Sequence, residues 1–480
     1  MSFILVIDVG TSSVRASIVR DDATVACVHQ EPTLPSTPAP GLVEIDAAQI
    51  WSAAVRCAEA ALAEGGPVGS VGIANQRAST IVWDRATGEP VGPGLGWQDL
   101  RTVGTCLVLQ ADGIRLAPNA SATKVAQLLD DHDPSRSREL LFGTIDTWLI
   151  WNLTGGAHHV TDLSNAGVTG LLHADGTAWN QQVLDALRIP ASALPTVVDS
   201  TGDVAAASVL PGAPVIRGIA GDQQASLVGQ GCVRPGMAKI TFGTGGMLDV
   251  VVDGRPVFEA RGGGGCFPIC AWREAGEITW GVEAIMLSAG TCVEWLRDDL
   301  AIIDSAADSH DVASRCDETG GVMFVPALLG LGTPDWDYGA RGTLLGVTRG
   351  TGRPEVVRAV LEGVAHRGAD LVEAAETDGG VAIPTLRVDG GMSANPTFVQ
   401  ALANATMRSI EVSPVLEATT LGAAFLAGLA DGTWSGWDDV AAAWAPSTVV
   451  DPSTPLDRER WQEARRRAAG WHGDLSALDF

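Results

Sequence analysis

The sequence predicts an α/β protein built from two doubly wound domains with a cleft between them. One short pattern occurs in both halves: residues 4–19 and 238–252 each read as an apolar strand, a turn rich in Gly, Thr or Ser, and a second apolar run. Strands, glycine turns and helices alternate in both halves, as they do in doubly wound sheets. The 480 residues are enough for two or three domains, each with its own core.

The first half of the chain combines short apolar strands with amphipathic helices. Ile50, Ala54, Cys57, Ala58 and Ala61 recur at helical spacing, which predicts that their segment is a helix. The predicted elements, in order, are a hairpin or meander over 1–30, a helix over 47–64, strands at 68–76 and 79–84, a helix over 121–132, a strand end and helix over 143–156, and a strand and helix over 214–231.

The second half repeats this alternation after a boundary near residues 232–236. Its predicted elements are the second hairpin, a strand at 321–330, a long helix over 354–375, a strand and glycine turn over 386–396 followed by a helix, an apolar helix of small residues over 419–430, and an Arg-rich helix over 458–469. We therefore expect an N-terminal domain over 1–234, a C-terminal domain over 235–445, and a tail with a helix over 446–480.

Composition excludes several classes of function. The formal net charge of −26 disfavours binding to nucleic acid or to anionic membranes, which both need a basic surface. The chain shows neither a signal peptide nor an apolar run long enough to span a membrane, so we expect a soluble cytoplasmic protein. Cys266 and Cys270 are the most closely spaced cysteines and lack a Cys/His partner set, so reduced thiols are expected rather than zinc ligands.

The two Gly-Thr turns suit phosphate binding, because they offer backbone N–H groups without bulky side chains. In the first turn, Asp8 ends a strand and could hold Mg²⁺ through water, while Arg15 adds a positive charge for a transferring group. An ordinary β-turn is the alternative for this segment alone. The matching turn at Gly243 and Thr244 favours phosphate, and two lobes gripping one nucleotide would perform phosphoryl transfer or NTP hydrolysis.

Other polar segments follow strands at points where open α/β sheets bind ligands. Asp222 stands at a strand-to-helix junction and could be a helix cap or a general base that accepts a proton from an alcohol; both remain open. Arg77 ends the polar run after the strand at 68–76, and Trp97 is either a platform for a polyol or a core residue. The glycine turn from Asp389 to Asn395 fits an adenosine pocket or a plain helix N-terminus.

In this order, these motifs resemble the FGGY carbohydrate kinase family, most closely its glycerol kinase branch. The resemblance covers residues 3 to about 435. The motifs that carry it include IDVGTSSVRA, GIANQRAST, WQDLRT, GTIDTWLIWNLTGG, GDQQASLVGQ, KITFGTGG, AGTCVEWLRD, RVDGGMSANP and TLGAAFLAGLA.

The resemblance implies two ribonuclease-H-like domains of the actin/hexokinase ATPase fold, with an active site in the cleft between them. It implies ATP- and Mg²⁺-dependent phosphorylation of a hydroxyl, usually a terminal one, on a small polyol or sugar. It places the catalytic base at Asp222 and associates Asp8 and Asp222 with the metal. The residues it assigns to ATP are Thr11, Ser12, Ser13, Arg15, Gly243, Thr244, Gly290, Glu294, Gly391 and Asn395, where Glu294 replaces a glutamine usual in glycerol kinases.

The substrate side departs from the glycerol kinase pattern. The residues placed there are Arg77, Ala78, Trp97, Asn119, Asp222, Gln223 and Met247. Ala78, Asn119 and Met247 stand where glycerol kinases carry a glutamate, a tyrosine and an aromatic residue. Since these replacements remove hydrogen bonds to a triol and enlarge the pocket, we expect a four- or five-carbon polyol or ketose as the preferred substrate. Glycerol kinase proper is the alternative.

Three other classes compete with a kinase. A degenerate kinase that acts as a sensor would have lost the base or a phosphate loop, whereas Asp8, Thr11, Asp222 and Thr244 are all present. Actin-like filament proteins and chaperone ATPases lack the two polar motifs, Asn75-Gln76-Arg77 and Gly221-Asp222-Gln223-Gln224, that are expected at a sugar site. A dinucleotide dehydrogenase is disfavoured because the glycines at 262–265 lack the required spacing. Relatives in the family suggest a homodimer or homotetramer.

Overall fold

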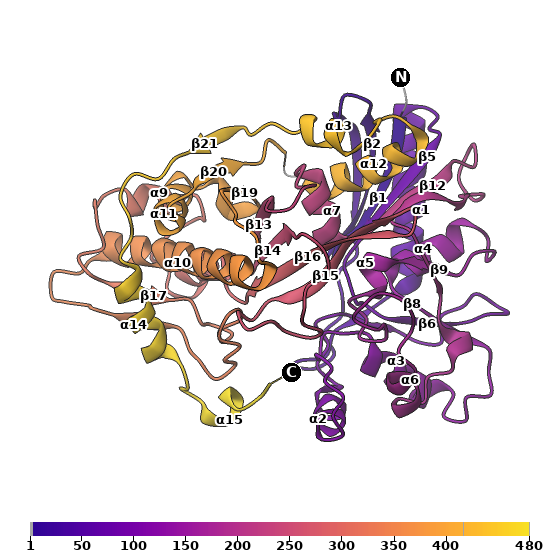
Figure 1. Ribbon diagram of the computed structural model, residues 1–480, viewed down its shortest axis with the longest axis horizontal. Coiled ribbons are helices and arrows are strands. Elements are labelled where there is room, and N and C mark those ends of the chain that lie inside the picture. The colour runs from indigo at the N-terminus through magenta and orange to yellow at the C-terminus, as the bar shows by residue number, and fades with distance from the viewer. Residues whose placement is uncertain (1–2, 416, 480) are drawn as a thin grey trace.

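A single sheet of thirteen strands runs through both lobes of the protein, as Figure 1 shows for the computed structural model. The structure describes residues 3–415 and 417–479. The strand order is β21-β20-β19-β13-β14-β16-β15-β11-β12-β5-β1-β2-β3. The N-terminal half of the chain forms one end of the sheet, and most of the C-terminal half forms the other.

The N-terminal lobe contains the first predicted hairpin as part of a three-stranded meander. β1 (Phe3–Val9), β2 (Ser13–Arg20) and β3 (Val25–Pro32) pair in antiparallel fashion. β5 (Ser70–Asn75) and β12 (Val215–Gly221) extend the sheet in parallel with β1, and β11 (Thr201–Ala206) follows antiparallel to β12.

The C-terminal lobe repeats this arrangement. β13 (Ala238–Phe242), β14 (Gly246–Val251) and β16 (Glu277–Met286) form the second antiparallel meander, and β15 (Phe267–Glu274) pairs with β16. β19 (Thr385–Asp389) and β20 (Ser409–Val412) run parallel to β13, and β21 (Thr448–Val450) closes the edge. The two predicted hairpins and the repeated α/β topology are therefore confirmed.

Helices cover both faces of the N-terminal part of the sheet. On one face, α1 (Ala47–Gly65) buries the predicted apolar stripe from Ile50 to Ala61, and Asp46 caps it by accepting a hydrogen bond from the backbone N–H of Gln49. α4 (Ile145–Leu153) contributes to the same core. On the other face lie α7 (Asp222–Gly229) and α12 (Ala418–Asp431).

The small residues of α12 let it approach α7 very closely, as the sequence predicts. A Cβ atom on Gly422 would lie 1.7 Å from the backbone oxygen of Ala225, and one on Gly229 would lie 1.8 Å from that of Ala418. Glycine is thus required on both helices. α12 packs on β1, β5 and β12, so a helix within the predicted C-terminal domain joins the core of the N-terminal lobe. The domain limits remain a prediction.

Smaller elements decorate the N-terminal lobe. Four short strands form two ribbons, β4 (Glu44–Ile45) with β7 (Gly94–Leu95) and β6 (Ile81–Asp84) with β8 (Leu140–Gly143), and β9 (Val160–Asp162) pairs with β10 (Thr196–Val198). The helices here are α2 (Val103–Ala111), α3 (Ala122–His132), α5 (Leu163–Ala166), α6 (Gln181–Ala186) and the 3₁₀ turn Ala191–Ala193. α3 and α6 share a separate apolar core with β6 and β8.

The C-terminal lobe is built around the long helix α10 (Arg353–Gly379), which crosses it in Figure 1. The other helices of this lobe are α8 (Gly290–Glu294), which continues as the π-helix Trp295–Asp299, then α9 (Asp308–Ala313), the 3₁₀ turn Gly391–Ala394, α11 (Pro396–Thr406), α14 (Arg458–Ala468) and α15 (Gly473–Ser476). α13 (Trp437–Ala442) packs with α12 in the core of the N-terminal lobe.

One predicted strand of this lobe is much shorter than expected. Residues 321–330 were expected to be extended throughout, whereas β17 spans only Met323–Val325 and pairs with β18 (Thr343–Leu345). Pro326 follows β17 and has no backbone N–H to donate, which explains the end of the strand. Among the residues that the structure describes, no helix is both long and apolar enough to cross a membrane.

Candidate active site

Three parallel strands of the N-terminal lobe end side by side. The register pairs Val9 of β1 with Asn75 of β5, and Asn75 with Gly221 of β12. The polar segments that follow these strands therefore meet at one edge of the sheet, where open α/β sheets bind ligands. These segments are the first Gly-Thr turn, the run Gln76-Arg77-Ala78, and Asp222-Gln223.

Asp222 is the first residue of α7 and does not cap it, since Gly221 occupies the cap position. Its Oδ1 accepts a hydrogen bond of 2.8 Å from the backbone N–H of Gln223, and its side chain remains 32% exposed. Loss of water around the carboxyl raises the pKa of Asp222, although the positive charge of Arg77 opposes this shift. The geometry thus favours a carboxylate that is accessible to substrate over a helix cap.

Asp8 lies near the end of β1. The nearby positive charge does not fully offset the loss of water around its carboxyl group. Burial raises the pKa of Asp8 to about 7; the positive charge of Arg15 lowers it, and the negative charge of Asp222 raises it further. Arg15 is itself held by a close ion pair with Glu417. Two partly exposed, mutually repelling carboxylates provide the oxygen ligands that Mg²⁺ prefers, so Asp8 and Asp222 fit this ion.

The first Gly-Thr turn is held in place by bonds to neighbouring segments. The backbone N–H of Gly10 donates to the oxygen of Ser13 (2.9 Å), and the indole N–H of Trp97 donates to Thr11 Oγ1 (3.4 Å). Ser13 Oγ accepts from the side chain of Gln30 (2.8 Å). Ser12 is exposed at the tip of the turn. The predicted phosphate residues Thr11, Ser12 and Ser13 therefore form one ordered turn beside Trp97.

The second Gly-Thr turn is anchored to the start of α8. The backbone N–H groups of Gly290 and Ala289 donate to the oxygens of Gly243 and Thr244, each at 2.9 Å. A Cβ atom on Gly290 would lie 2.6 Å from the oxygen of Gly243, so this close approach requires glycine. Thr244 remains exposed at this turn.

A cavity of about 610 Å³ in the C-terminal lobe brings together all six residues that were predicted to bind ATP in this lobe. They are Gly243, Thr244, Gly290, Glu294, Gly391 and Asn395. This volume is within the range typical of pockets for small molecules and cofactors. Asn395 also caps α11 through its Oδ1 and donates from its Nδ2 to Ser309 Oγ (2.9 Å), so it both starts a helix and lines the cavity; the adenosine pocket stays a prediction.

Sequence reasoning missed several residues of this cavity. The additional lining includes Val293, Arg297, Ser309, His310, Leu361 and Met392. They come from α8, the π-helix, α9, α10 and the turn before α11, and lie far apart along the chain. The apolar spacing of these helices marks a buried face equally well, so no signal in the sequence separated a pocket wall from a core residue.

Arg77 is fixed from three sides. Its Nη2 lies 2.7 Å from Glu283 Oε2, its Nε lies 3.5 Å from Asp222 Oδ1, and its Nη1 donates to Gln224 Oε1 at 3.4 Å. Glu283 lies on β16 in the other lobe and was not predicted from the sequence. Its contact was not predictable because no short-range pattern relates residues 77 and 283.

The other predicted substrate residues differ in their surroundings. Trp97 and Met247 are half-buried, and Met247 stands opposite Thr241 in the hairpin of β13 and β14. Ala78 is 5% exposed and adopts a left-handed backbone conformation, with φ of 60°. Its carbonyl oxygen accepts a hydrogen bond from Ser121 Oγ (2.9 Å). Asn119 is exposed in a turn.

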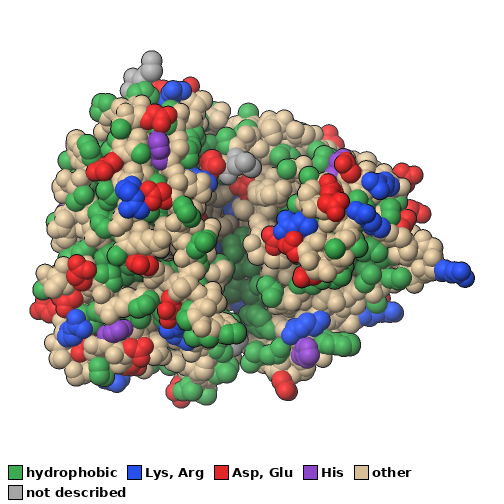
Figure 2. Space-filling view, turned by 180° about the vertical axis from the view of Figure 1, so that it is seen from behind, with side chains coloured by type: hydrophobic (Ala, Val, Ile, Leu, Met, Phe, Trp, Pro, Cys, Tyr) green, Lys and Arg blue, Asp and Glu red, His purple; other side chains and the backbone are tan. Residues whose placement is uncertain are grey.

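The groove between the two lobes is visible in Figure 2.

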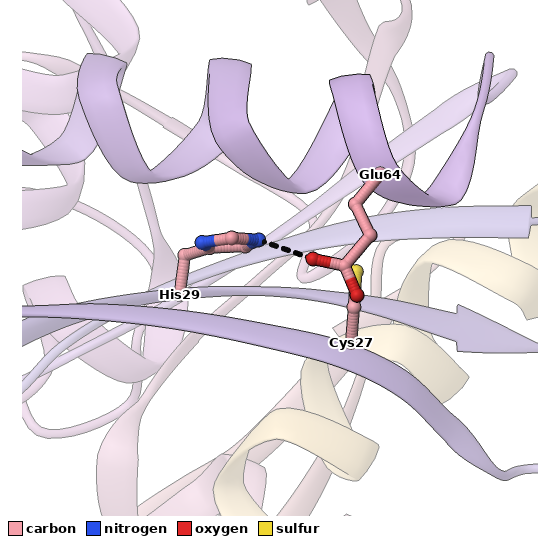
Figure 3. A group of neighbouring side chains, drawn as sticks. All are labelled: Cys27, His29 and Glu64. Carbon is pink, nitrogen blue, oxygen red and sulfur yellow. Dashed lines mark hydrogen bonds and ion pairs between the residues drawn. The ribbon is translucent and has the colours of Figure 1, made fainter.

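One group of potential metal ligands lies away from this edge of the sheet, among the residues that the structure describes. Cys27 and His29 of β3 and Glu64 of α1 place their ligand atoms within 4.8 Å of one another, and His29 Nε2 lies 2.9 Å from Glu64 Oε2 (Figure 3). Burial raises the pKa of the Cys27 thiol, which disfavours the thiolate that a metal needs. Burial likewise raises the pKa of Cys266 and Cys270.

The fold and this site define a two-lobed phosphotransferase. Comparison with known proteins identifies the family: residues 3–229 match the N-terminal domain, and residues 238–430 the C-terminal domain, of the FGGY family of carbohydrate kinases. The chain belongs to this family. It is an ATP-dependent carbohydrate kinase that uses an alcohol group as acceptor, with ATP and Mg²⁺ as its cofactors.

Individual relatives are similar over nearly their whole length. A glycerol kinase from Trichlorobacter lovleyi is 42% identical, with 98% of this chain and 99% of that protein covered. The crystal structure of Plasmodium falciparum glycerol kinase with ADP has a TM-score of 0.88 at 27% identity and covers 100% of this chain and 99% of its own. A ligand-bound xylulose kinase from Lactobacillus acidophilus has a TM-score of 0.87 at 21% identity and 99% coverage of both chains, which shows the shared fold alone.

Proposed function

We propose that the protein transfers the terminal phosphoryl group of ATP to a terminal hydroxyl of glycerol, forming glycerol 3-phosphate and ADP. The observation that carries this choice of substrate is the 42% identity to a glycerol kinase over 98% of the chain. The expected four- or five-carbon substrate has weaker support, because the xylulose kinase described above is only 21% identical to this chain. Glycerol, the alternative in the sequence analysis, is therefore the better-supported substrate.

In the proposed reaction Asp222 acts as the general base. Its carboxylate accepts the proton of the substrate hydroxyl while the hydroxyl oxygen forms a bond to the γ-phosphorus and the bond from phosphorus to the bridging oxygen of ADP breaks. The raised pKa of Asp222 favours uptake of this proton. Gln223 and Arg77 orient the acceptor beside Asp222, and Trp97 provides an apolar platform for its carbon atoms.

The two Gly-Thr turns bind the phosphates from opposite lobes. Thr11, Ser12 and Ser13 contribute from the N-terminal lobe, and Gly243 and Thr244 contribute from the C-terminal lobe, where the cavity with Gly391 and Asn395 takes the nucleoside. Asp8 and Asp222 would hold Mg²⁺, which supplies positive charge to the phosphate oxygens when bound. Arg15 reaches the transferring group only if its ion pair with Glu417 is shared or opened.

One observation favours a larger polyol or ketose as a second candidate. Ala78 and Asn119 supply neither a carboxylate nor a phenol to the substrate side, and Asn119 lies exposed in a turn. A site with fewer hydrogen-bonding partners holds a triol less tightly.

Cytoplasmic location and assembly into a homodimer or homotetramer also remain proposals; sedimentation velocity tests the assembly.

A substrate panel decides between the two candidates. ADP release is measured with ATP and, in turn, glycerol, erythritol, threitol, ribitol, arabinitol, xylulose and ribulose. We expect the highest kcat/KM with glycerol. A longer polyol or ketose that exceeds glycerol tenfold would replace glycerol by the second candidate. Absence of turnover with every acceptor would remove both and favour a sensor that binds ATP or a sugar.

A further inference from the structure

A row of charged side chains crosses five neighbouring strands of the C-terminal lobe. The registers pair Glu411 of β20 with Arg387 of β19, Arg387 with Lys239 of β13, Lys239 with Asp249 of β14, and Asp249 with Glu283 of β16. Directly paired residues of neighbouring strands project to the same face of a sheet. Lys239 and Asp249 have no exposed surface, and Glu283 is 5% exposed.

This row lies against α7, the helix that begins with Asp222. At the far end of α7, the guanidinium of Arg387 donates to the backbone oxygen of Gln230, stacks on Trp444 and lies 3.1 Å from Glu411. At the near end, Lys239 Nζ donates to Gln223 Oε1 at 2.6 Å. The row therefore contacts both ends of the helix that carries the proposed base.

The bond from Lys239 fixes the orientation of the Gln223 amide. An ammonium group has donors only, so the group that faces it must be the amide oxygen. Gln223 is thereby left to offer its Nε2 amide group to the acceptor, and it can donate to a hydroxyl oxygen there. Lys239 is also paired with Asp249 at 2.7 Å and donates to Thr241 Oγ1 at 3.0 Å, so its own position is well determined.

The other end of the row fixes Arg77 on the opposite side of Asp222. Glu283 is bound to Arg77 Nη2 at 2.7 Å, and Arg77 Nε approaches Asp222 at 3.5 Å. Burial raises the pKa of Glu283 to about 7; the positive charge of Arg77 lowers it, and the adjacent Asp249 raises it. Five ionisable groups, Lys239, Asp249, Glu283, Arg77 and Asp222, are thus linked in one chain that joins the two lobes. Its first three members are buried, and it ends at the partly exposed Asp222.

We propose that Lys239, Asp249 and Glu283 are positioning residues that hold Gln223 and Arg77 in the orientation needed to bind the polyol hydroxyls beside Asp222. This inference rests on the proposed function. A buried ion network that only ties the lobes together would stabilise the fold without favouring either substrate. The two roles differ in selectivity. Loss of a positioning residue weakens binding of the polyol and leaves binding of ATP, whose proposed cavity lies in the C-terminal lobe, nearly unaffected.

The test removes the central ion pair as a unit in the double variant Lys239→Met/Asp249→Leu. Replacing both partners by apolar residues avoids a lone buried charge, which would itself unfold the protein. The matched control is Arg387→Met/Glu411→Leu, which removes the distal ion pair on the same face of the sheet and under the same helix. Thermal unfolding, kcat, and the KM values for glycerol and ATP are measured for both variants and for the wild type.

We expect the central variant to raise the KM for glycerol at least tenfold and to change the KM for ATP by less than twofold. The control should change neither KM by more than twofold, even where its unfolding temperature falls. Equal changes in both KM values, or an unchanged KM for glycerol, would overturn the positioning role. If the central variant does not fold, Glu283→Gln gives the same decision: it should raise the KM for glycerol and change the KM for ATP by less than twofold.

The wild-type arm separates the two hypotheses. Turnover of glycerol by the wild type, together with an unaltered KM in the central variant, refutes the positioning role alone. If the wild type phosphorylates a longer polyol instead, the same comparison is made with that polyol. If the wild type phosphorylates no acceptor in the panel, the proposed function fails and the positioning role fails with it.

Discussion

The contact between α7 and α12 makes a quantitative prediction, because both helices depend on glycine where they touch. In Gly422→Ala the new Cβ atom would lie 1.7 Å from the backbone oxygen of Ala225, and such contacts are essentially never shorter than 3.0 Å. The helices must therefore separate by about 1.3 Å, and neither backbone can yield as a flexible side chain would. Overpacking of this kind costs about 1–3 kcal/mol or more.

The change in helix propensity partly offsets this cost. Alanine stabilises a helix interior by about 1 kcal/mol relative to glycine. Because the clash is between two backbones, we take the upper end of the overpacking cost, about 3 kcal/mol, and expect Gly422→Ala to lower the free energy of unfolding by about 2 kcal/mol. Because α7 begins with Asp222, the displacement should also lower kcat.

Urea denaturation followed by tryptophan fluorescence measures the effect on stability. The matched control is Gly104→Ala, since Gly104 lies in the first turn of α2 and its Cβ would meet no atom within 4 Å. This control should be neutral or slightly stabilising. A Gly422→Ala protein as stable as the control would refute the argument that α7 and α12 are packed as closely as described.

Three further predictions concern Asp8, His366 and Asn395. Since the pKa of Asp8 is about 7, kcat/KM should fall about tenfold between pH 8 and pH 6, and higher Mg²⁺ should shift this acidic limb to lower pH; a limb insensitive to Mg²⁺ would argue against Asp8 as a metal-associated group. Burial lowers the pKa of His366 to about 3, below its unfolded value of 6.5, so the folded state binds fewer protons. The stability that this neutral histidine contributes is complete above pH 6.5 and is lost as the pH falls towards 3, by up to about 5 kcal/mol. His366→Phe, which can keep the stacking on Trp461, should flatten this part of the curve of unfolding temperature against pH; an unchanged slope would contradict the shift. Asn395→Ala should cost about 1 kcal/mol of stability through loss of the cap and should weaken ADP binding about fivefold in calorimetry; unchanged ADP affinity would restrict Asn395 to the capping role.

The local parts of this structure could be predicted from the sequence, because short-range patterns specify them. The two Gly-Thr hairpins, the apolar stripe of α1 and the small-residue helix α12 are all confirmed. The six residues predicted to bind ATP in the C-terminal lobe line one cavity. Five of them follow a strand or stand at the start of a helix, and Glu294 ends α8. Such positions carry recognisable glycine and polar residues.

Long-range contacts could not be predicted in this way. Nothing in the sequence relates Lys239 to Gln223 or Asp249, or Glu283 to Arg77. Alternation along a strand shows which face a residue occupies and does not show which residue stands opposite. The packing of α12 on the N-terminal lobe and the pairing of Arg15 with Glu417 likewise depend on how the chain returns to its starting lobe.

The most direct test of the account measures ADP release by purified wild-type protein and Asp222→Asn with ATP, Mg²⁺ and glycerol, together with calorimetric ADP binding to both. We predict turnover by the wild type, a loss of at least a thousandfold in kcat for Asp222→Asn, and ADP affinities that agree within about twofold, since Asp222 lies outside the cavity that we propose for the nucleoside. Asp222→Asn protein that turns over glycerol at a rate near that of the wild type would contradict the assignment of Asp222 as the general base, and with it the mechanism built on this site.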